Sequence, residues 1–292
     1  MNFTAQSDKK WVAIADQETT SVRVYDLDAS VCDETSEVWS FHAPWKNKFQ
    51  DIRMRELNGR EVLVAACDTD YACIVDIETK DVLWSTHKGA SNPHSIELLP
   101  NGIIAVGATT GKELHFFDLN GPEPSKMLAC FGPHDFHGLL YDPNLDRLWA
   151  WGDTELHLLK VERTADGIEY TVETTYTIEE RWGHDLQPVI GSGGKKFWLT
   201  NHHHVLQFDT ETRTFSEDYP GAELIAVTDT KAVGNYADGT VVTMVPDAGF
   251  LPWTSYTIRV FTPGENGFTR KDIPIPGRAS YKVRAWNARY CE

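Results

Sequence analysis

The sequence lacks any long apolar run: its longest apolar stretches reach five or six residues, far short of the roughly 18 that a membrane-spanning helix needs. It is also poor in positive charge, with 27 Lys and Arg against 43 Asp and Glu and a net charge of −16. A surface this acidic repels phosphate backbones and anionic lipids, so we expect neither nucleic acid nor a membrane as partner. The motifs GxSxG, P-loop, HExxH and GxGxxG are missing, which argues against the enzyme classes they define.

Cysteine is scarce, with five residues, an odd number, and no CxxC pair. Cys67 and Cys73 lie six residues apart across a predicted turn and could form one disulfide, but buried free thiols are the commoner state. The first sixteen residues, MNFTAQSDKKWVAIAD, lack the basic-then-apolar order of a signal peptide. We therefore expect a cytoplasmic monomer, although a secreted chain trimmed of its leader would look the same.

A short apolar strand that ends near an acidic residue and precedes a turn recurs along the chain. Its six copies are SVRVYDLD (21–28), ACIVDIETKDVLWS (72–85), ELHFFDLN (113–120), ELHLLKVER (155–163), HVLQFDTETRTF (204–215) and SYTIRVFTPGENGF (255–268). The steps between equivalent residues are 50, 42, 42, 49 and 52. Repeats of this length, with about four strands each, are typical of β-propeller blades. A β-sandwich also has short alternating strands, but six regularly spaced units favour the propeller.

The two ends of the chain complement each other. Residues 10–43 show the later strands of a blade without an inner strand ahead of them, whereas 280–287 read as an inner strand with nothing after it. We predict that 280–287 complete the N-terminal blade, which leaves no long unpaired sheet edge. The expected fold is an all-β, six-bladed propeller with four-stranded blades, forming a single domain over residues 1–292.

Histidines recur at one position of the predicted inner strands. Two residues before the first apolar residue of each inner strand lie, in chain order, Gln50, His94, His137, His184, Lys231 and Tyr281. These strand starts gather around the channel mouth of a propeller, so we expect the three histidines, spaced by 43 and 47 residues, to meet there. Two positions stay open, because Asp51 could replace Gln50 and Glu223 could replace Lys231 if 222–227 formed the inner strand.

Three converging imidazoles are typical ligands of a divalent cation such as Mn²⁺, Ca²⁺ or Zn²⁺, and Gln50 could add an oxygen ligand. Without a metal, the same histidines could act as general acid and base. The candidate catalytic residues are Lys231, Tyr281 and Arg284. Positively charged side chains can recognise an anion, and aromatic faces suit sugar rings. The candidate substrate-binding residues are therefore Lys282, Arg53, Trp182, Trp253 and His202. Backbone hydrogen bonding or core packing is the alternative role for each.

The segments NPHSIELLPNGIIAVGA (92–108), FHGLLYDPNLDRLWAWG (136–152) and GHDLQPVIGSGGKKFWLTN (183–201) resemble a group of bacterial six-bladed propellers. The first also resembles the blade starts of lactonase-type propellers, which bind a calcium-class ion through Glu, Asn and Asp where this chain has histidines.

The set Gln50, His94, His137 and His184 is similar to the metal site of oligogalacturonate lyase, a metal-dependent propeller that acts on uronic-acid oligosaccharides. The resemblance implies that these four residues hold the metal and that the chain is a carbohydrate-active lyase with an oligosaccharide or other small-molecule substrate. Two other functions stay open: a non-catalytic propeller that binds a sugar or a protein, and a metal-dependent hydrolase or isomerase of a small sugar derivative.

Overall fold

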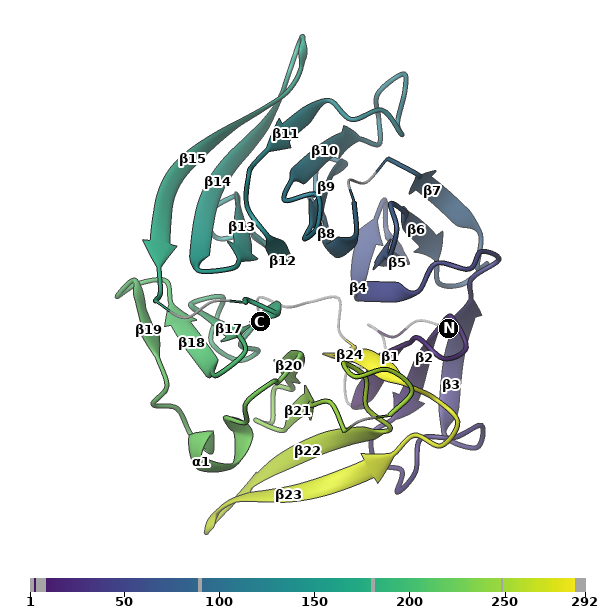
Figure 1. Ribbon diagram of the computed structural model, residues 1–292, viewed down its shortest axis with the longest axis vertical. Coiled ribbons are helices and arrows are strands. Elements are labelled where there is room, and N and C mark those ends of the chain that lie inside the picture. Colours follow the sequence, from purple (N-terminus) through teal and green to yellow (C-terminus); the bar gives the residue numbers. More distant parts are fainter. Residues whose placement is uncertain (1–2, 4–8, 89–90, 180–181, 248, 287–292) are drawn as a thin grey trace. The chain divides into compact units, whose positions relative to one another are not determined.

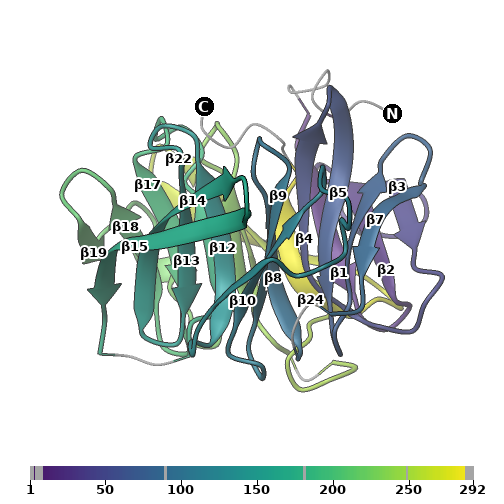
Figure 2. The ribbon, with the colours of Figure 1, turned by 90° about the horizontal axis from the view of Figure 1, so that it is seen from above.

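The computed structural model describes residues 3, 9–88, 91–179, 182–247 and 249–286. Its regular structure is almost entirely strand, arranged in six four-stranded antiparallel sheets (Figures 1 and 2). This confirms the predicted fold class, an all-β six-bladed propeller with four-stranded blades. Among the described residues, the structure has no helix with the length and apolar character needed to span a membrane.

The chain divides into two compact units, each described by itself. Unit 1, Gln50–Gly183, contains three blades. Blade 2 consists of β4 (Phe49–Leu57), β5 (Arg60–Cys67), β6 (Ala72–Asp76) and β7 (Val82–Thr86). Blade 3 consists of β8 (Pro93–Leu98), β9 (Ile103–Ala108), β10 (Leu114–Asp118) and β11 (Ala129–Phe131). Blade 4 consists of β12 (Phe136–Asp142), β13 (Arg147–Gly152), β14 (Glu155–Thr164) and β15 (Gly167–Thr177).

Unit 2 comprises Phe3–Phe49 and the chain from His184 onward, and also contains three blades. Blade 1 consists of β24 (Ser280–Ala285), β1 (Trp11–Asp16), β2 (Ser21–Asp26) and β3 (Glu37–His42). Blade 5 consists of β16 (Asp185–Pro188), β17 (Lys196–Thr200), β18 (Val205–Asp209) and β19 (Thr214–Ser216). After the short helix α1 (Ala222–Ile225), blade 6 consists of β20 (Ala232–Asn235), β21 (Val241–Met244), β22 (Thr257–Gly264) and β23 (Gly267–Pro274). The single domain over 1–292 stays a prediction.

The C-terminal strand completes the N-terminal blade. β24 pairs antiparallel with β1, with Ala285 opposite Val12 and Val283 opposite Ile14 (Figure 1, yellow beside purple). This confirms the predicted pairing of the two ends; residue 287 of the predicted strand lies outside the described residues. The pairing covers the edge of β1 that would otherwise expose unpaired backbone groups.

The acidic residue that recurs at the end of the third strand closes the turn that follows. Asp76 Oδ1 accepts hydrogen bonds from the N–H groups of Glu78 and Thr79, each at 2.9 Å. Asp209 makes the same two bonds, also at 2.9 Å, to the second and third residues after it. An aspartate that binds the backbone of its own turn stabilises that turn. The sequence repeat therefore has the same local physical cause in blades 2 and 5.

Apolar side chains fill the space between neighbouring blades within each unit. In unit 1, Phe116 of β10 packs in one buried cluster with Leu139 of β12 and Leu148 of β13. Such packing fixes the starts of the inner strands, which carry the candidate site residues. Cys67 and Cys73 are both buried, and no disulfide joins them to each other, as expected.

Candidate functional site

Two of the predicted histidines meet at the strand starts of unit 1. His94 is the second residue of β8 and His137 the second residue of β12, and their ring centroids lie 4.9 Å apart. The shared register thus brings together rings that are 43 residues apart in sequence. A metal bound through one ring nitrogen lies roughly 3 Å from the ring centroid, so two rings at this separation can share a cation.

Neighbouring groups orient both rings through Nδ1. His94 Nδ1 lies 3.1 Å from the carbonyl oxygen of Asn92, and His137 Nδ1 lies 3.3 Å from Asp135 Oδ1. Burial raises the pKa of Asp135, but the His137 ring and nearby positive groups more than offset this, so its pKa lies below the usual range. A carbonyl or carboxylate at Nδ1 sets the tautomer in which Nε2 is the ligand atom.

Gln50 occupies the matching position of blade 2 and is buried. The next residue, Asp51, accepts a hydrogen bond at 3.4 Å from the N–H of Ile96 in the neighbouring inner strand. Asp185 of blade 5 accepts the equivalent bond, at 3.2 Å, from the N–H of Val233. Asp51 and Asp185 are therefore at equivalent positions of their blades. The residue before each of them, Gln50 or His184, is at the strand position where the histidines recur. Of the two alternatives for blade 2, Gln50 is the one at that position.

In unit 2, Lys231 and His184 form a close pair. Lys231 Nζ lies 2.7 Å from His184 Nε2, so the ammonium can donate a hydrogen bond to the imidazole. Lys231 directly precedes β20, the inner strand of blade 6, whereas Glu223 lies in α1. This decides between the two alternatives for blade 6 in favour of Lys231.

The pair belongs to a small polar cluster. Asp229 Oδ1 lies 3.8 Å from Lys231 Nζ and 2.6 Å from His202 Nδ1, so the predicted residue His202 joins the cluster through this carboxylate. Burial lowers the pKa of Lys231, and the charge of Asp229 only partly opposes this. A lysine with a lowered pKa beside an imidazole is suited to proton transfer.

Lys282 holds the backbone around the pair in place. Its buried Nζ donates hydrogen bonds to the carbonyl oxygens of His184 and Lys231, the latter at 2.6 Å. The sequence predicts substrate binding for Lys282. These bonds favour a positioning role, because the ammonium is engaged by main-chain oxygens at the starts of two inner strands.

Arg53 and Arg284 are paired with buried carboxylates. Arg284 donates to both oxygens of Asp185, at 2.8 and 2.9 Å, and Arg53 Nε donates to Asp51 at 2.9 Å. Each pair is almost fully buried. A buried carboxylate already neutralises each guanidinium. The pairing therefore favours a structural role over the predicted catalytic role of Arg284 and the predicted substrate contact of Arg53.

Tyr281 packs in the apolar core of unit 2. It shares a buried cluster with Val283, Val12 and Ile14, and it is 5% exposed. The ammonium of the next residue, Lys282, lies 5.3 Å from the centroid of the Tyr281 ring. This position favours core packing over the predicted catalytic role.

The two predicted tryptophans are accessible in their respective units. In unit 1, Trp182 is 55% exposed, and its backbone N–H donates to Asp153 Oδ1 at 3.1 Å. In unit 2, Trp253 is 43% exposed, and its indole N–H donates to Gln17 Oε1 at 3.0 Å. The Trp253 ring is thus held by a polar contact of its own, the Trp182 contact fixes only the backbone, and much of the surface of both rings can meet a ligand.

Unit 1 contains two clusters that the sequence analysis did not identify. The ligand atoms of Glu113, His115 and Cys130 lie within 4.8 Å of one another, and so do those of His134, Glu155 and His157. Both clusters contain the tripeptide Glu-Leu-His, and residues two apart in a strand lie on the same face. The signal that could have revealed them is this repeated Glu-x-His pair, 42 residues apart.

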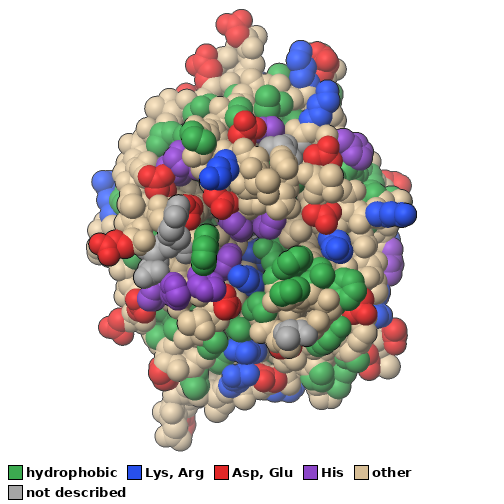
Figure 3. Space-filling view, in the orientation of Figure 1, with side chains coloured by type: hydrophobic (Ala, Val, Ile, Leu, Met, Phe, Trp, Pro, Cys, Tyr) green, Lys and Arg blue, Asp and Glu red, His purple; other side chains and the backbone are tan. Residues whose placement is uncertain are grey.

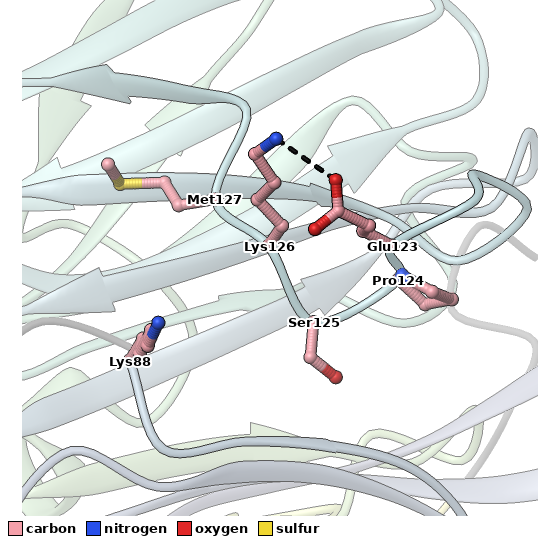
Figure 4. Close-up of a pocket in the computed structure, with 6 residues that line it drawn as sticks. All are labelled: Lys88, Glu123, Pro124, Ser125, Lys126 and Met127. Atoms are coloured by element: carbon pink, nitrogen blue, oxygen red, sulfur yellow. Dashed lines mark hydrogen bonds and ion pairs between the residues drawn. The ribbon is translucent and has the colours of Figure 1, made fainter.

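A surface pocket of about 620 Å³ lies at the loop between β10 and β11 of unit 1 (Figure 4). Its lining residues are Lys88, Glu123, Pro124, Ser125, Lys126 and Met127. Lys126 Nζ pairs with Glu123 Oε1 at 3.0 Å, so part of its charge is already neutralised. The pocket indicates no ligand class.

On the face that Figure 3 shows, acidic side chains are spread out rather than gathered at one place. Figure 3 shows them on this face of each unit, interspersed with basic, histidine and hydrophobic side chains. On this face, the net charge of −16 therefore marks no single binding surface.

No protein-family profile matches the sequence, and no curated protein is significantly similar to it. Among solved structures, the chain is similar to one titled "Crystal Structure of Mitotic Checkpoint Complex". The TM-score is 0.57 at 11% sequence identity, covering 94% of this chain and 81% of that chain. At this identity the likeness shows the fold alone. A total of 1273 solved chains match structurally, so the fold is too widely shared to specify a function.

Proposed function

We propose that the protein is a carbohydrate-active enzyme, a lyase that cleaves oligosaccharides containing uronic acid. The observation that carries the proposal is the 2.7 Å contact between Lys231 Nζ and His184 Nε2 in unit 2. Elimination next to a carboxylate needs a base that is neutral near physiological pH, and burial lowers the pKa of Lys231 toward that range. We expect a cytoplasmic monomer that acts on free oligosaccharides.

In the proposed reaction, the neutral amine of Lys231 removes the proton on the carbon next to the uronate carboxylate. The electron pair of that C–H bond forms a carbon–carbon double bond, and the bond to the glycosidic oxygen breaks. A water molecule returns a proton to the leaving oxygen; Tyr281, the other donor predicted, lies in the core. His184 accepts a hydrogen bond from the Lys231 ammonium and can take up its proton, which restores the base. The resulting imidazolium then gives this proton to the hydroxide that the water left behind, so no net proton is gained or lost.

A divalent cation at the strand starts of unit 1 is the second part of the proposal. His94 and His137 fit such an ion, because their rings lie 4.9 Å apart and both Nδ1 atoms face oxygen atoms. Gln50 would add an oxygen ligand from the matching position of blade 2. When bound, the cation would supply positive charge for neutralising a carboxylate.

The test is the ultraviolet absorbance of unsaturated product when purified protein is mixed with galacturonate, glucuronate or mannuronate oligomers. We expect Lys231→Met to lower kcat by about 10²–10⁴-fold, the range for loss of a general base. Lys231→Arg should be similarly impaired, because a guanidinium stays protonated. In the wild type, kcat/KM should rise with pH as Lys231 loses its proton.

The matched control is Lys195→Met, because Lys195 is exposed and pairs with Glu211 at the surface. This variant should keep wild-type activity. Absence of product from every uronate oligomer, or a Lys231→Met variant as active as the wild type, would contradict the proposal.

A non-catalytic sugar-binding function is favoured by one observation in unit 2. Phe250, Trp253 and Tyr256 are each 39–45% exposed and lie within seven residues of one another. Aromatic faces of this kind can stack on sugar rings. Under this function, uronate oligomers bind without turnover, and Trp253→Ala weakens binding while Leu83→Ala, another exposed apolar residue, does not.

A further inference from the structure

We infer that His134, Glu155 and His157 of unit 1 form a binding site for a divalent zinc-class cation, separate from the strand-start histidines. Glu155 and His157 lie in β14, and His134 lies in the loop that connects β11 to β12. Two imidazoles and one carboxylate are a common zinc ligand set, in which a water molecule takes the fourth position.

The distances between the ligand atoms fit this assignment. Glu155 Oε2 lies 2.9 Å from His134 Nδ1 and 3.6 Å from His157 Nε2. Atoms bound 2.0–2.1 Å from a tetrahedral zinc lie roughly 3.3 Å apart, between these two values. The centroids of the His134 and His157 rings are 4.5 Å apart, so small side-chain movements would bring all three ligand atoms to one ion.

An unsatisfied nitrogen points into the cluster. His157 is 3% exposed, and its Nε2 is buried without a hydrogen-bond partner among the described residues. Leaving a buried polar atom without a partner is costly, and a ligand that supplies the missing partner removes the cost.

The surroundings hold the cluster in a form suited to metal binding. Thr175, the cross-strand neighbour of His157 on β15, bonds to His157 Nδ1 at 3.0 Å and fixes the ring orientation. The rings of Phe131 and Phe136 lie 5.2 and 6.2 Å from the His157 ring and exclude water on that side. His134 and Glu155 are about one-quarter and one-third exposed, so the open coordination position faces solvent.

The cluster of Glu113, His115 and Cys130 is less suited to binding a metal ion. His115 Nε2 lies 2.6 Å from Glu113 Oε2, and His115 Nδ1 lies 3.1 Å from the carbonyl oxygen of Lys88. Both ring nitrogens of His115 are engaged, whereas Nε2 of His157 has no hydrogen-bond partner among the described residues. Burial and the nearby Glu113 raise the pKa of Cys130, which opposes the thiolate that a metal requires.

The experiment is a titration of chelator-treated full-length protein with Zn²⁺ and, separately, Co²⁺, followed by calorimetry and visible absorption. The titration uses the His94→Gln background, so that a cation at the strand-start histidines does not contribute. We expect one equivalent of Zn²⁺ to bind, and the Co²⁺ form to show tetrahedral ligand-field bands without a thiolate charge-transfer band. His157→Gln and Glu155→Gln should each weaken binding at least about tenfold, whereas His115→Gln should bind as the parent does.

Three results would overturn the inference: no Zn²⁺ binding by the parent, unchanged affinity in both His157→Gln and Glu155→Gln, or a thiolate-to-cobalt band that identifies Cys130 as a ligand. Circular dichroism melts of each variant show whether a loss of binding reflects loss of the fold. Because Glu155 is partly exposed, Glu155→Gln is the variant expected to keep the parent melting profile. None of these readouts depends on lyase activity.

Discussion

Blades 3 and 4 carry the same tripeptide, Glu-Leu-His, at the start of their third strands, yet the two histidines have different partners. His115 of blade 3 lies between Glu113 and the carbonyl oxygen of Lys88, so both of its nitrogens are engaged. His157 of blade 4 bonds through Nδ1 to Thr175, and its Nε2 has no hydrogen-bond partner among the described residues. The same local sequence therefore gives a histidine with both ring nitrogens engaged in blade 3, and a histidine whose Nε2 is available to a metal in blade 4.

The difference arises outside the tripeptide. The loop before blade 3 contributes the Lys88 carbonyl to His115, whereas the loop before blade 4 contributes the His134 side chain to the Glu155–His157 pair. A carbonyl accepts a proton and satisfies an imidazole, whereas a second imidazole adds another metal ligand. The loop residue, more than the strand motif, decides what the strand histidine can do.

The largest effect that separates the two blades should be zinc-dependent stability. With Zn²⁺ at 100 times its dissociation constant, we expect parent protein to gain about 2.7 kcal/mol in free energy of unfolding. Glu155→Gln should lose about half of this gain or more, because removal of a charged ligand weakens binding at least about tenfold, and Glu113→Gln should keep it. Urea unfolding with and without Zn²⁺ measures both values. An equal zinc-dependent gain in the two variants would remove the distinction between the blades.

The next largest effect concerns Thr175, which orients the proposed metal ligand His157. Thr175→Val removes the hydrogen bond to His157 Nδ1 and should weaken Zn²⁺ binding by about 10–100-fold, the range for loss of an orienting partner. Thr171→Val, at an exposed position of the same strand opposite Lys160, is the matched control and should bind as the parent does. Competition with a fluorescent chelator measures the affinities. Equal affinity in the two variants would show that Thr175 does not orient the ligand.

The smallest expected effect on stability concerns an ion pair that joins the third strands of blades 3 and 4. Arg163 of β14 donates to both oxygens of Asp118 of β10, and these hydrogen bonds hold the pKa of Asp118 below its usual range. The stability that they confer is therefore fully present above the unfolded-state pKa of about 3.9 and is lost as the pH falls through the lower folded-state value. Asp118→Asn should cost roughly 0.5–1 kcal/mol at neutral pH, because the guanidinium is partly exposed.

Urea unfolding at a series of pH values tests this prediction. The stability difference between wild type and Asp118→Asn should shrink as the pH falls below about 4. Asp81→Asn, at an exposed position directly before β7, is the control and should follow the wild-type pH profile. A difference that stays constant with pH would show that the Asp118 carboxylate does not stabilise the fold through its charge.

Features that repeat along the chain were predictable. The blade pattern follows from apolar strands closed by turn-binding aspartates, and the pairing of β24 with β1 follows from a blade that lacks its inner strand in sequence. The register of the inner strands placed His94 beside His137 and Lys231 beside His184, because equivalent positions of neighbouring blades lie side by side.

Individual side-chain partners were not predictable in the same way. The sequence analysis assigned Arg284 a catalytic role and Arg53 and Lys282 a substrate contact, but their partners are buried carboxylates and main-chain carbonyl oxygens. Which face of β24 meets the core, and hence where Tyr281 packs, depends on the pairing with β1 and on the neighbouring blade. The partners of Lys282 and Arg284 lie 51 and 99 residues away in sequence.

The sequence by itself determined the number of blades, their order and the residues that begin each inner strand, because strand length, turn chemistry and repeat spacing are local properties. Only the tertiary structure decided which charges are neutralised, which histidine keeps an unsatisfied nitrogen, and which lysine has its pKa lowered. Each of these depends on burial and on atoms brought within about 4 Å from other blades, and such distances arise only when the blades pack.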